Sequence, residues 1–292
     1  MTVAISGASG FVGTHLLSAC RQSGLACIAV VFRSGSSAMR QLPHADALVH
    51  LGAIAHSDAS NQSEVMAANR DLTIEVARSA RNFGYRHFVF MSSALVWGSN
   101  YDCVQLGTLE KPDTAYGRAK LEAEQVLLAT QSSDWNVSII RPPLLYGAGV
   151  KGNLAKLLRA VHLWPICPLG VDTNRRSLAN VENLSAFIVH LLVRNLSGQY
   201  CLQDEKPIST LGMLERMAAH MPHHGRVVRM PRGLRHCVRA VAPRTARQLF
   251  GSLVIEDNTA AKAGFAPPHT MEDGFAKMVH AYLDFTSRRI EL

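Results

Sequence analysis

The sequence has no apolar run that approaches the roughly 18 residues of a membrane-spanning helix, so it predicts no transmembrane segment. We also expect no cleaved signal peptide, because a glycine-rich motif begins within a few residues of Met1. The six cysteines lack CxxC spacing, which favours separate buried thiols in a reducing compartment over a disulfide framework or a zinc site. Together these absences indicate a cytoplasmic protein.

Acidic residues are in short supply, at 22 against 30 lysines and arginines, and the formal net charge is +8. This excess favours an anionic ligand or surface. No aromatic platform or reader motif accompanies it, so nucleic acid is not expected as a partner. With 292 residues, 48% of them hydrophobic and 18% charged, the chain can bury a large core and is typical of folded proteins.

A glycine-rich turn lies between a predicted strand and a predicted helix near Met1. Val3–Ile5 is a short apolar strand; Gly7 then permits a tight turn, Gly10 an approach to phosphates, and Gly13 close packing of helix on strand. Strand, glycine turn and helix together present free backbone N–H groups and the positive end of a helix to a diphosphate. This context predicts dinucleotide binding rather than a plain strand–helix corner, with contacts from Gly7, Ser9, Gly10, Phe11, Val12 and Gly13.

The second predicted strand, Leu25–Phe32, is almost continuously apolar, which is typical of a central parallel strand covered on both faces. At the end of this strand NAD-binding folds often carry an acidic residue that accepts a hydrogen bond from the adenosine ribose. This sequence has Arg33 there, followed by serines. An arginine with serines suits a 2′-phosphate, so NADP(H) is favoured over NAD(H); a solvated loop arginine is the alternative.

Strands at 46–51 and 87–91 flank a helix predicted over 64–83. This alternation predicts an α/β fold with a Rossmann-like doubly wound parallel sheet. Ligands of such sheets bind beyond the carboxyl ends of the strands, where the glycine turn, Gly52 and Ser93 would lie.

Tyr116 and Lys120 lie four residues apart in a predicted helix that starts near Thr114, so both project from one helical face. A tyrosine with a pKa near ~10 is a poor base at neutral pH, and we expect the neighbouring ammonium to lower that pKa. Lys120 can also hydrogen-bond ribose hydroxyls. Ser93, at a strand end facing the same site, can hold the substrate oxygen whose proton moves. Together with the glycine turn, this arrangement favours catalysis over a structural use of the YxxxK pattern.

These motifs occur in the order found in one enzyme family. The chain resembles the extended short-chain dehydrogenase/reductases, specifically their nucleotide-sugar epimerase/dehydratase branch. Within the branch it is most similar to bacterial UDP-sugar 4-epimerase-like and 4-ketoreductase proteins of surface-polysaccharide synthesis. The matching segments are Ser6–Gly13, His50–Ala53, Asn69, Ser92–Gly98, Tyr116–Lys120, Arg141–Pro143 and Arg176–Leu178.

The resemblance implies a catalytic triad of Ser93, Tyr116 and Lys120. It also implies a helper role for Asn69, whose helix supports the lysine. Besides the glycine turn and Arg33, the cofactor contacts expected on this basis are Leu51, Gly52, Ala53, Asn69, Met91, Tyr116, Lys120 and Pro142.

The interval between Arg33 and Asp46 is short for this family, whose members usually carry a third strand there that ends in residues holding adenine. This chain is expected to lack that strand and to have a narrower sheet with an open adenine side, which bears on cofactor affinity rather than on the chemistry. We expect an NAD(P)-binding Rossmann domain over 1–143, rejoined by 178–206. A smaller C-terminal substrate-binding region would comprise 144–177 and 207–292.

Relatives place an asparagine near the substrate's diphosphate or sugar at the position of Asn153, with helix capping as the alternative role. Arg176 can bind diphosphate oxygens bidentately, with a solvent-facing position as the alternative. The three histidines His220, His223 and His224 resemble a metal spacing, but a proline between them breaks the helix that would align them, so no metal site is predicted.

The C-terminal third carries arginines from Arg232 to Arg247 in a predicted helix pair. Three interpretations stay open: phosphate contacts, an acidic membrane surface or partner, and a solvated basic face, the last being the commonest for such runs. An apolar stripe from Met271 to Tyr282 indicates core packing or a homodimer contact.

The leading hypothesis is an NAD(P)-dependent enzyme that moves a hydride between C4 of a UDP-sugar and a nicotinamide ring. Tyr116 would exchange the proton of O4, Ser93 would position that oxygen, and Lys120 would hold the ribose and tune the tyrosine. Return of the hydride to the other face of the sugar gives 4-epimerisation, whereas release of oxidised cofactor from a 4-keto sugar gives 4-ketoreduction. The alternative is a non-catalytic NADP(H)-sensing or scaffolding protein on the same fold, although such proteins commonly lose the tyrosine or the lysine.

Overall fold

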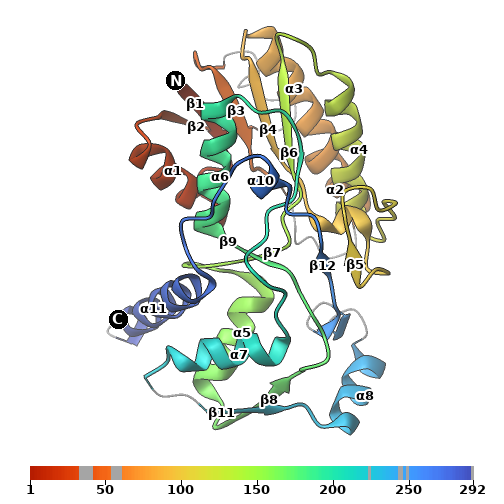
Figure 1. Cartoon of the computed structure of the whole chain (residues 1–292), viewed down its shortest axis with the longest axis vertical. Coiled ribbons are helices and arrows are strands. Elements are labelled where there is room, and N and C mark those ends of the chain that lie inside the picture. The colour runs from red at the N-terminus through yellow and green to blue at the C-terminus, as the bar shows by residue number, and fades with distance from the viewer. Residues whose placement is uncertain (33–41, 54–60, 223–224, 243–245, 248–249, 291–292) are drawn as a thin grey trace.

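The computed structural model describes residues 1–32, 42–53, 61–222, 225–242, 246–247 and 250–290 (Figure 1). Its main feature is a six-stranded sheet in which every neighbouring pair of strands is parallel. This confirms the α/β doubly wound fold that the alternation of strands and helices predicts. The strand order is β10 (Gly198–Tyr200), β6 (Asn136–Ile140), β4 (His87–Met91), β3 (Ala47–His50), β1 (Thr2–Ser6) and β2 (Ala26–Val30).

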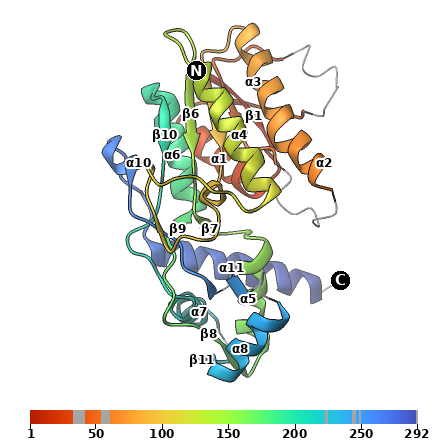
Figure 2. The same cartoon turned by 90° about the vertical axis from the view of Figure 1, so that its right-hand side faces the viewer.

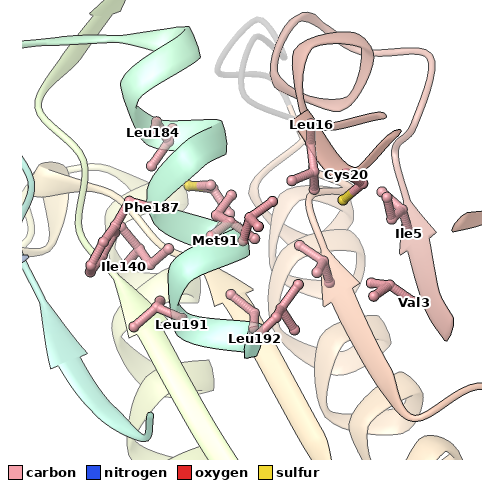
Figure 3. Close-up of a cluster of buried hydrophobic side chains, with 14 of the residues drawn as sticks. Val3, Ile5, Leu16, Cys20, Met91, Ile140, Leu184, Phe187, Leu191 and Leu192 are labelled. Atoms are coloured by element: carbon pink, nitrogen blue, oxygen red, sulfur yellow. The ribbon is translucent and has the colours of Figure 1, made fainter. Parts of the chain in front are cut away.

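Two pairs of helices cover the sheet, one pair on each face (Figure 1). Successive side chains of a strand point to opposite faces. In β4, Met91 therefore packs with Leu16 and Phe187 on one side (Figure 3), whereas Phe88 and Phe90 join the cluster on the other. The first pair of helices is α1 (Phe11–Gln22) and α6 (Val181–Arg194), and the second is α3 (Leu72–Asn82) and α4 (Ala115–Ala129).

β2 is an edge strand, so the expectation of a central strand covered on both faces is wrong. Its side chains are half-buried or exposed, and no described strand pairs with it on the side away from β1. An apolar run indicates that a strand packs against something, but it does not identify the neighbours in the sheet. Residues 33–41, which include Arg33 and most of the interval where relatives carry a third strand, lie outside the described residues.

The helix predicted over 64–83 consists of three consecutive pieces. α2 (Gln62–Met66) is followed by a π-helical turn, η2 (Ala67–Asp71), and then by α3. Such π-turns frequently occur at functional sites. η2 contains Asn69 and packs against α4, the helix that carries Tyr116 and Lys120.

A second core, which lies below the sheet in Figure 1, is formed by buried residues between 146 and 178, between 208 and 221, and between 271 and 279. The apolar stripe of α11 belongs to this core, because Met271, Phe275, Met278 and Val279 are buried in it. Between these elements the chain returns to the sheet, since α6 packs against α1 and β10 pairs with β6. The remaining described helices are η3 (Ala94–Trp97), α5 (Gly152–Leu163), α7 (Thr210–Ala219), α8 (Arg232–Val241), α10 (Thr259–Lys262) and α11 (Met271–Ile290); the paired strands are β7 (Leu144–Tyr146) with β9 (Leu178–Asn180), β8 (Ile166–Gly170) with β11 (Arg226–Arg229), and β5 (Cys103–Val104) with β12 (Val254–Ile255).

The cysteines are not all buried as expected. Cys20, Cys167 and Cys201 are buried, whereas Cys103 and Cys237 are exposed. In the described part of the chain no group of three or more His, Cys, Asp or Glu side chains could hold a metal ion, and His223 and His224 lie outside that part. None of the described helices combines the length and apolar character needed to span a bilayer.

Candidate active site

The glycine turn between β1 and α1 packs too tightly for side chains. Gly7 has a φ of +71°, which favours glycine, and an added Cβ would lie 2.9 Å from the Gly52 nitrogen. At Gly13 an added Cβ would lie 2.3 Å from the Gly7 carbonyl oxygen, so α1 can rest on the turn only without a side chain there. The Gly10 amide closes the turn by donating to the Gly7 carbonyl at 2.9 Å.

The N-terminus of α1 is suited to an anion. Its N-cap residue, Gly10, provides no side-chain cap, and its first turn contains no acidic residue. The first N–H groups of a helix have no acceptor within the helix, and the helix dipole adds positive potential there. A diphosphate fits these donors, so the turn from Gly7 to Gly13 suits a dinucleotide. Leu51 and Gly52, which follow β3, border the same turn because they pack against Gly7.

Gly117 brings the start of α4 against the segment that follows β4. Thr114 caps α4 by accepting a hydrogen bond from the Gly117 amide at 3.0 Å. An added Cβ at Gly117 would lie 2.5 Å from the carbonyl oxygen of Leu95 in η3. Ser93 is the N-cap residue of η3, and its Oγ accepts a hydrogen bond from the Leu95 amide at 3.2 Å. The turn that begins at Ser93 and the first turn of α4, which carries Tyr116, therefore pack against each other.

Lys120 is fully buried one helical turn after Tyr116. Its Nζ donates to the Met91 carbonyl at the end of β4 at 2.8 Å. The same nitrogen lies 4.5 Å from the ring centroid of Phe90 and 5.6 Å from that of Tyr116. Burial lowers the pKa of Lys120 to about 7, although the nearby charge of Glu124 acts to raise it. Lys120 can therefore change its charge near neutral pH.

Burial raises the pKa of Tyr116 to about 12, which corrects the expected lowering by the neighbouring ammonium. Lys120 Nζ lies over the ring of Tyr116, and burial disfavours its own charge, so it offers the phenolate little stabilisation. A phenol with this pKa keeps its proton at neutral pH. In this state Tyr116 is set to donate a proton to a developing alkoxide.

The structure also contains a buried ion pair, between Arg141 and Glu124, that the sequence did not predict. The Arg141 guanidinium donates to Glu124 through Nε at 3.0 Å and Nη2 at 2.6 Å, and both side chains are buried. Nη2 also donates to Glu110 at 2.9 Å, and the guanidinium carbon lies 4.9 Å from the ring centroid of Trp97. The hydroxyl of Ser92 donates to Glu124. Glu124 thereby fixes the backbone immediately before Ser93.

The signal for this pair was present in the spacing. Glu124 lies four residues after Lys120, on the same face of α4, and an acid on a buried helical face requires a partner. The arginine that supplies it lies directly after β6, in the motif Arg141–Pro143. Nothing local connects the two residues, because they meet only when β6 and α4 pack together.

His50 is a second buried polar residue close to the predicted site. Its Nδ1 lies 2.8 Å from Ser6 Oγ, and its ring stacks on those of Phe88 and Phe90. Burial lowers the pKa of His50 to about 3, with a smaller contribution from Lys120, so the ring is neutral. Its Nε2 has no hydrogen-bond partner within the described ranges.

Most of the other predicted cofactor contacts lie at the carboxyl ends of the strands. Met91 ends β4, Pro142 follows β6, and the Pro142 carbonyl accepts a hydrogen bond from the Ala94 amide at 3.0 Å. Asn69 is buried in η2, where its Nδ2 donates to the Val65 carbonyl at 2.9 Å. All the predicted cofactor contacts stay predictions: Gly7, Ser9, Gly10, Phe11, Val12, Gly13, Leu51, Gly52, Ala53, Asn69, Met91, Tyr116, Lys120 and Pro142, together with Arg33, which lies outside the described residues.

The candidate substrate residues lie in the second part of the chain. Asn153 is in the first turn of α5, whose N-cap residue is Lys151, so Asn153 does not cap the helix. Arg176 is half-buried, and its guanidinium donates to the carbonyls of Gly251 at 2.7 Å and Arg247 at 2.9 Å. Burial lowers the pKa of Arg176 to about 10. No described carboxylate forms an ion pair with it.

Arg247, whose carbonyl accepts a hydrogen bond from Arg176, also contacts the residues that precede α4. Its Nη1 donates to Ser99 Oγ at 2.7 Å and lies 3.9 Å from the carboxylate of Asp113, immediately before the cap of α4. Arg176 therefore holds the segment of Arg247 and Gly251 through their carbonyls. Arg247 in turn joins this segment to Ser99 and Asp113, which precede α4, the helix that carries Tyr116. The sequence shows Arg247 only as one member of the arginine run.

A family model covers the part of the chain that contains these residues. The model of the NAD dependent epimerase/dehydratase family matches residues 3–200, which is more than half of the chain. The chain belongs to the NAD-dependent epimerase/dehydratase family. It is therefore an NAD(P)-dependent enzyme of the extended short-chain dehydrogenase/reductase type.

The chain is similar to curated relatives and to solved structures, of which two of each are described. It is 27% identical to the UDP-glucose 4-epimerase of Vibrio cholerae over 98% of this chain and 97% of the relative. It is 29% identical to the N-acetyl-alpha-D-glucosaminyl-diphospho-ditrans,octacis-undecaprenol 4-epimerase of Escherichia coli O157:H7, over 68% of this chain and 65% of the relative.

Among solved structures, MoeE5 in complex with UDP-glucose and NAD has a TM-score of 0.77 at 20% identity and covers 99% of this chain and 100% of its own. RMD from Pseudomonas aeruginosa complexed with NADPH has a TM-score of 0.77 at 18% identity and covers 97% of this chain and 99% of its own. At these identities the solved structures establish the fold. Because they include complexes with NAD and with NADPH, they leave the cofactor preference open.

Proposed function

We propose that this epimerase/dehydratase acts at C4 of a UDP-sugar, as a 4-epimerase or a 4-ketoreductase, in the synthesis of bacterial surface-polysaccharide precursors in the cytoplasm. The observation that carries the proposal is the placement of Tyr116. It lies in the first turn of a helix that packs against the turn of Ser93, with Lys120 Nζ 5.6 Å from its ring centroid. A phenol, an amine and an alcohol at the carboxyl edge of a parallel sheet suit proton transfer to and from a substrate hydroxyl.

The chain's own groups divide the chemistry between them. A bound nicotinamide supplies reversible hydride transfer at C4. Tyr116 gives the O4 oxygen its proton in reduction and takes it back in oxidation, and Ser93 orients that oxygen. Lys120, whose pKa is lowered to about 7, holds the ribose hydroxyls and exchanges protons near neutral pH.

Two binding regions complete the proposal. The turn from Gly7 to Gly13 holds the cofactor diphosphate, and we favour NADP(H) over NAD(H) because of Arg33. Arg176 and Asn153 bind the sugar nucleotide. Support for Arg176 comes from its guanidinium, which is desolvated and whose acceptors among the described residues are carbonyl oxygens, so an arriving diphosphate offers it stronger acceptors.

A second candidate substrate is a sugar joined through a diphosphate to a polyprenol. The relative from Escherichia coli O157:H7 is named for such a substrate, and it matches 68% of this chain. The same three residues would perform the same chemistry on it, since the sugar ring and the diphosphate are shared. The two candidates differ only in what lies beyond the diphosphate.

The test is cofactor turnover with UDP-sugars, UDP-4-keto sugars and a polyprenyl-diphosphate sugar. Interconversion of C4 epimers without net cofactor consumption indicates an epimerase, and stoichiometric NADPH oxidation with a 4-keto sugar indicates a reductase. Absence of turnover on all three, together with cofactor binding seen as a raised melting temperature, would instead support the sensing or scaffolding alternative.

A further inference from the structure

The positive charge of this protein is concentrated in one segment. Between Glu215 and Glu256 the chain has eight arginines and no lysine, aspartate or glutamate. The other 252 residues carry 22 lysines and arginines and 22 acidic residues, so this segment accounts for the whole net charge of +8. The segment contains β11 and α8, which lie at the end of the molecule furthest from the six-stranded sheet (Figures 1 and 2).

The β8–β11 pair has one buried face and one exposed face. Cys167 and Val227 pair in register and pack into the second core. Ile166 and Arg226 pair in the preceding position, so their side chains share the opposite face. Both are exposed, with 60% of Ile166 accessible to solvent.

Two more large apolar side chains are exposed where α5 ends, in the segment that leads to β8. Leu163 and Trp164 end α5 with exposed fractions of 54% and 45%. The Arg226 amide donates to the Pro165 carbonyl at 2.9 Å, which holds the loop of Trp164 next to the start of β11. Exposed aromatic and aliphatic side chains of this size are costly in water unless a partner covers them.

α8 extends the positive charge along this end of the molecule. The Met230 amide donates to the Gly170 carbonyl at 2.7 Å, and α8 begins at Arg232 two residues later. Arg226 and Arg232 are exposed, and neither forms an ion pair with any described carboxylate. We call Leu163, Trp164, Ile166, Arg226 and Arg232 the distal face.

We propose that the distal face docks this protein on the surface of a bilayer that contains anionic phospholipid. Arginines are attracted to the negative surface potential of such a bilayer. Trp164 has an apolar ring and a polar N–H, the combination that is enriched at the membrane–water boundary, and the aliphatic side chains can enter the headgroup region beside it. Trp164 is the one aromatic ring of the distal face, and Leu163 and Ile166 beside it add aliphatic area on which no base could stack, which favours lipid over nucleic acid.

The test is co-sedimentation of the full-length protein with vesicles of phosphatidylcholine alone and of phosphatidylcholine mixed with phosphatidylglycerol. We expect binding only to the mixed vesicles, with weakening at high salt. The variant Arg226→Gln/Arg232→Gln should bind about 25-fold more weakly, at roughly fivefold per arginine. Trp164→Ser should bind roughly tenfold more weakly through loss of apolar contact.

Matched controls separate the distal face from net charge. Arg21→Gln/Arg78→Gln removes two exposed arginines from α1 and α3, and Phe83→Ser removes a side chain with 46% exposure, close to the 45% of Trp164. Both controls should bind within twofold of wild type. Circular dichroism and melting temperature check that every variant is folded.

Three results would overturn the proposal: no binding of wild type to the mixed vesicles, equal weakening by the control pair, or tighter binding to double-stranded DNA that the distal substitutions abolish. The assay contains no sugar nucleotide, so its outcome is independent of the proposed enzymatic activity. Failure of one proposal therefore leaves the other standing.

Discussion

Two neighbouring regions of the interior each hold a buried basic side chain, and they differ in whether carboxylates surround it. At the end of β4, the one described acceptor of Lys120 is the Met91 carbonyl, and its Nζ lies over aromatic rings. At the end of β6, Arg141 donates to the carboxylates of Glu124 and Glu110. Glu124 lies one helical turn from Lys120 but is engaged by Arg141 and Ser92.

Because of this difference, Arg141 keeps its charge, whereas Lys120 can lose its proton near neutral pH. Burial lowers the pKa of Arg141, but the hydrogen bonds and charge of Glu124 and Glu110 outweigh it and raise the pKa overall, so Arg141 stays charged. For Lys120 the charge of Glu124 offsets the effect of burial only in part, and its pKa falls to about 7. The arginine region thus holds α4 and the segment of Ser93 in place, while the lysine region keeps a group able to exchange protons.

The largest expected effect is on stability at the arginine. Arg141→Met leaves the buried carboxylate of Glu124 without its partner, and we expect a loss of about 3–5 kcal/mol in the free energy of unfolding. Urea denaturation measures this. The double variant Arg141→Met/Glu124→Gln removes both charges and should recover more than half of the loss, and a loss as large as that of the single variant would contradict the account.

The lysine should behave in the opposite way. Lys120→Met replaces a desolvated ammonium by an apolar chain of similar length, so the free energy of unfolding at pH 7 should change by less than about 1.5 kcal/mol. Turnover on the true substrate should nevertheless fall by about 100-fold or more, because a proton-exchanging group is lost. A variant that is severely unfolded and equally active per folded molecule would reverse the comparison.

The pH dependence of stability follows from the same lowered pKa. Between pH 7 and the ordinary lysine pKa of 10.5, the unfolded chain binds a proton that the folded protein does not, so the contribution of Lys120 to stability rises with pH. Below pH 7 its burial penalty is fully present. From pH 7 to pH 9 wild type should gain about 2 kcal/mol relative to Lys120→Met, measured by urea denaturation of both proteins. Parallel pH curves would show that the lysine keeps its ordinary pKa.

The smallest expected effect concerns His50, whose only hydrogen-bond partner among the described residues is Ser6. Ser6→Ala leaves Nδ1 of the buried imidazole unpaired and should cost about 1 kcal/mol. Ser23→Ala, an exposed serine at the end of α1, is the control and should stay within about 0.5 kcal/mol of wild type. Thermal unfolding of the three proteins is sufficient, and equal melting temperatures would show that His50 does not need this partner.

Features encoded by local patterns were predicted well. The glycine turn, the strand–helix alternation and the four-residue spacing of Tyr116 and Lys120 each lie within a short stretch, and the six-stranded parallel sheet confirms the fold they imply. Features that depend on contacts between residues distant in sequence were not predicted correctly. The edge position of β2 depends on which strands pair with it, and the raised pKa of Tyr116 depends on how deeply α4 packs.

The same distinction explains the polar residues that were missed or left open. Glu124 meets Arg141 only after β6 has joined the sheet, and Arg176 finds its acceptors at Arg247 and Gly251, far along the chain. Sequence identifies these residues as polar or basic, but it does not give their partners. Residue type and spacing therefore predict which groups share one face of α4, but not the charge partners and pKa values that packing gives them.

The central claim is that Tyr116 exchanges the substrate proton beside a bound nicotinamide. The most direct test is single-turnover change of nicotinamide absorbance with a UDP-sugar or a UDP-4-keto sugar, in wild type and in Tyr116→Phe. The account predicts a rate about 100- to 10,000-fold lower in the variant, with the cofactor-induced rise in melting temperature retained. An undiminished rate in a variant that still binds cofactor would contradict it.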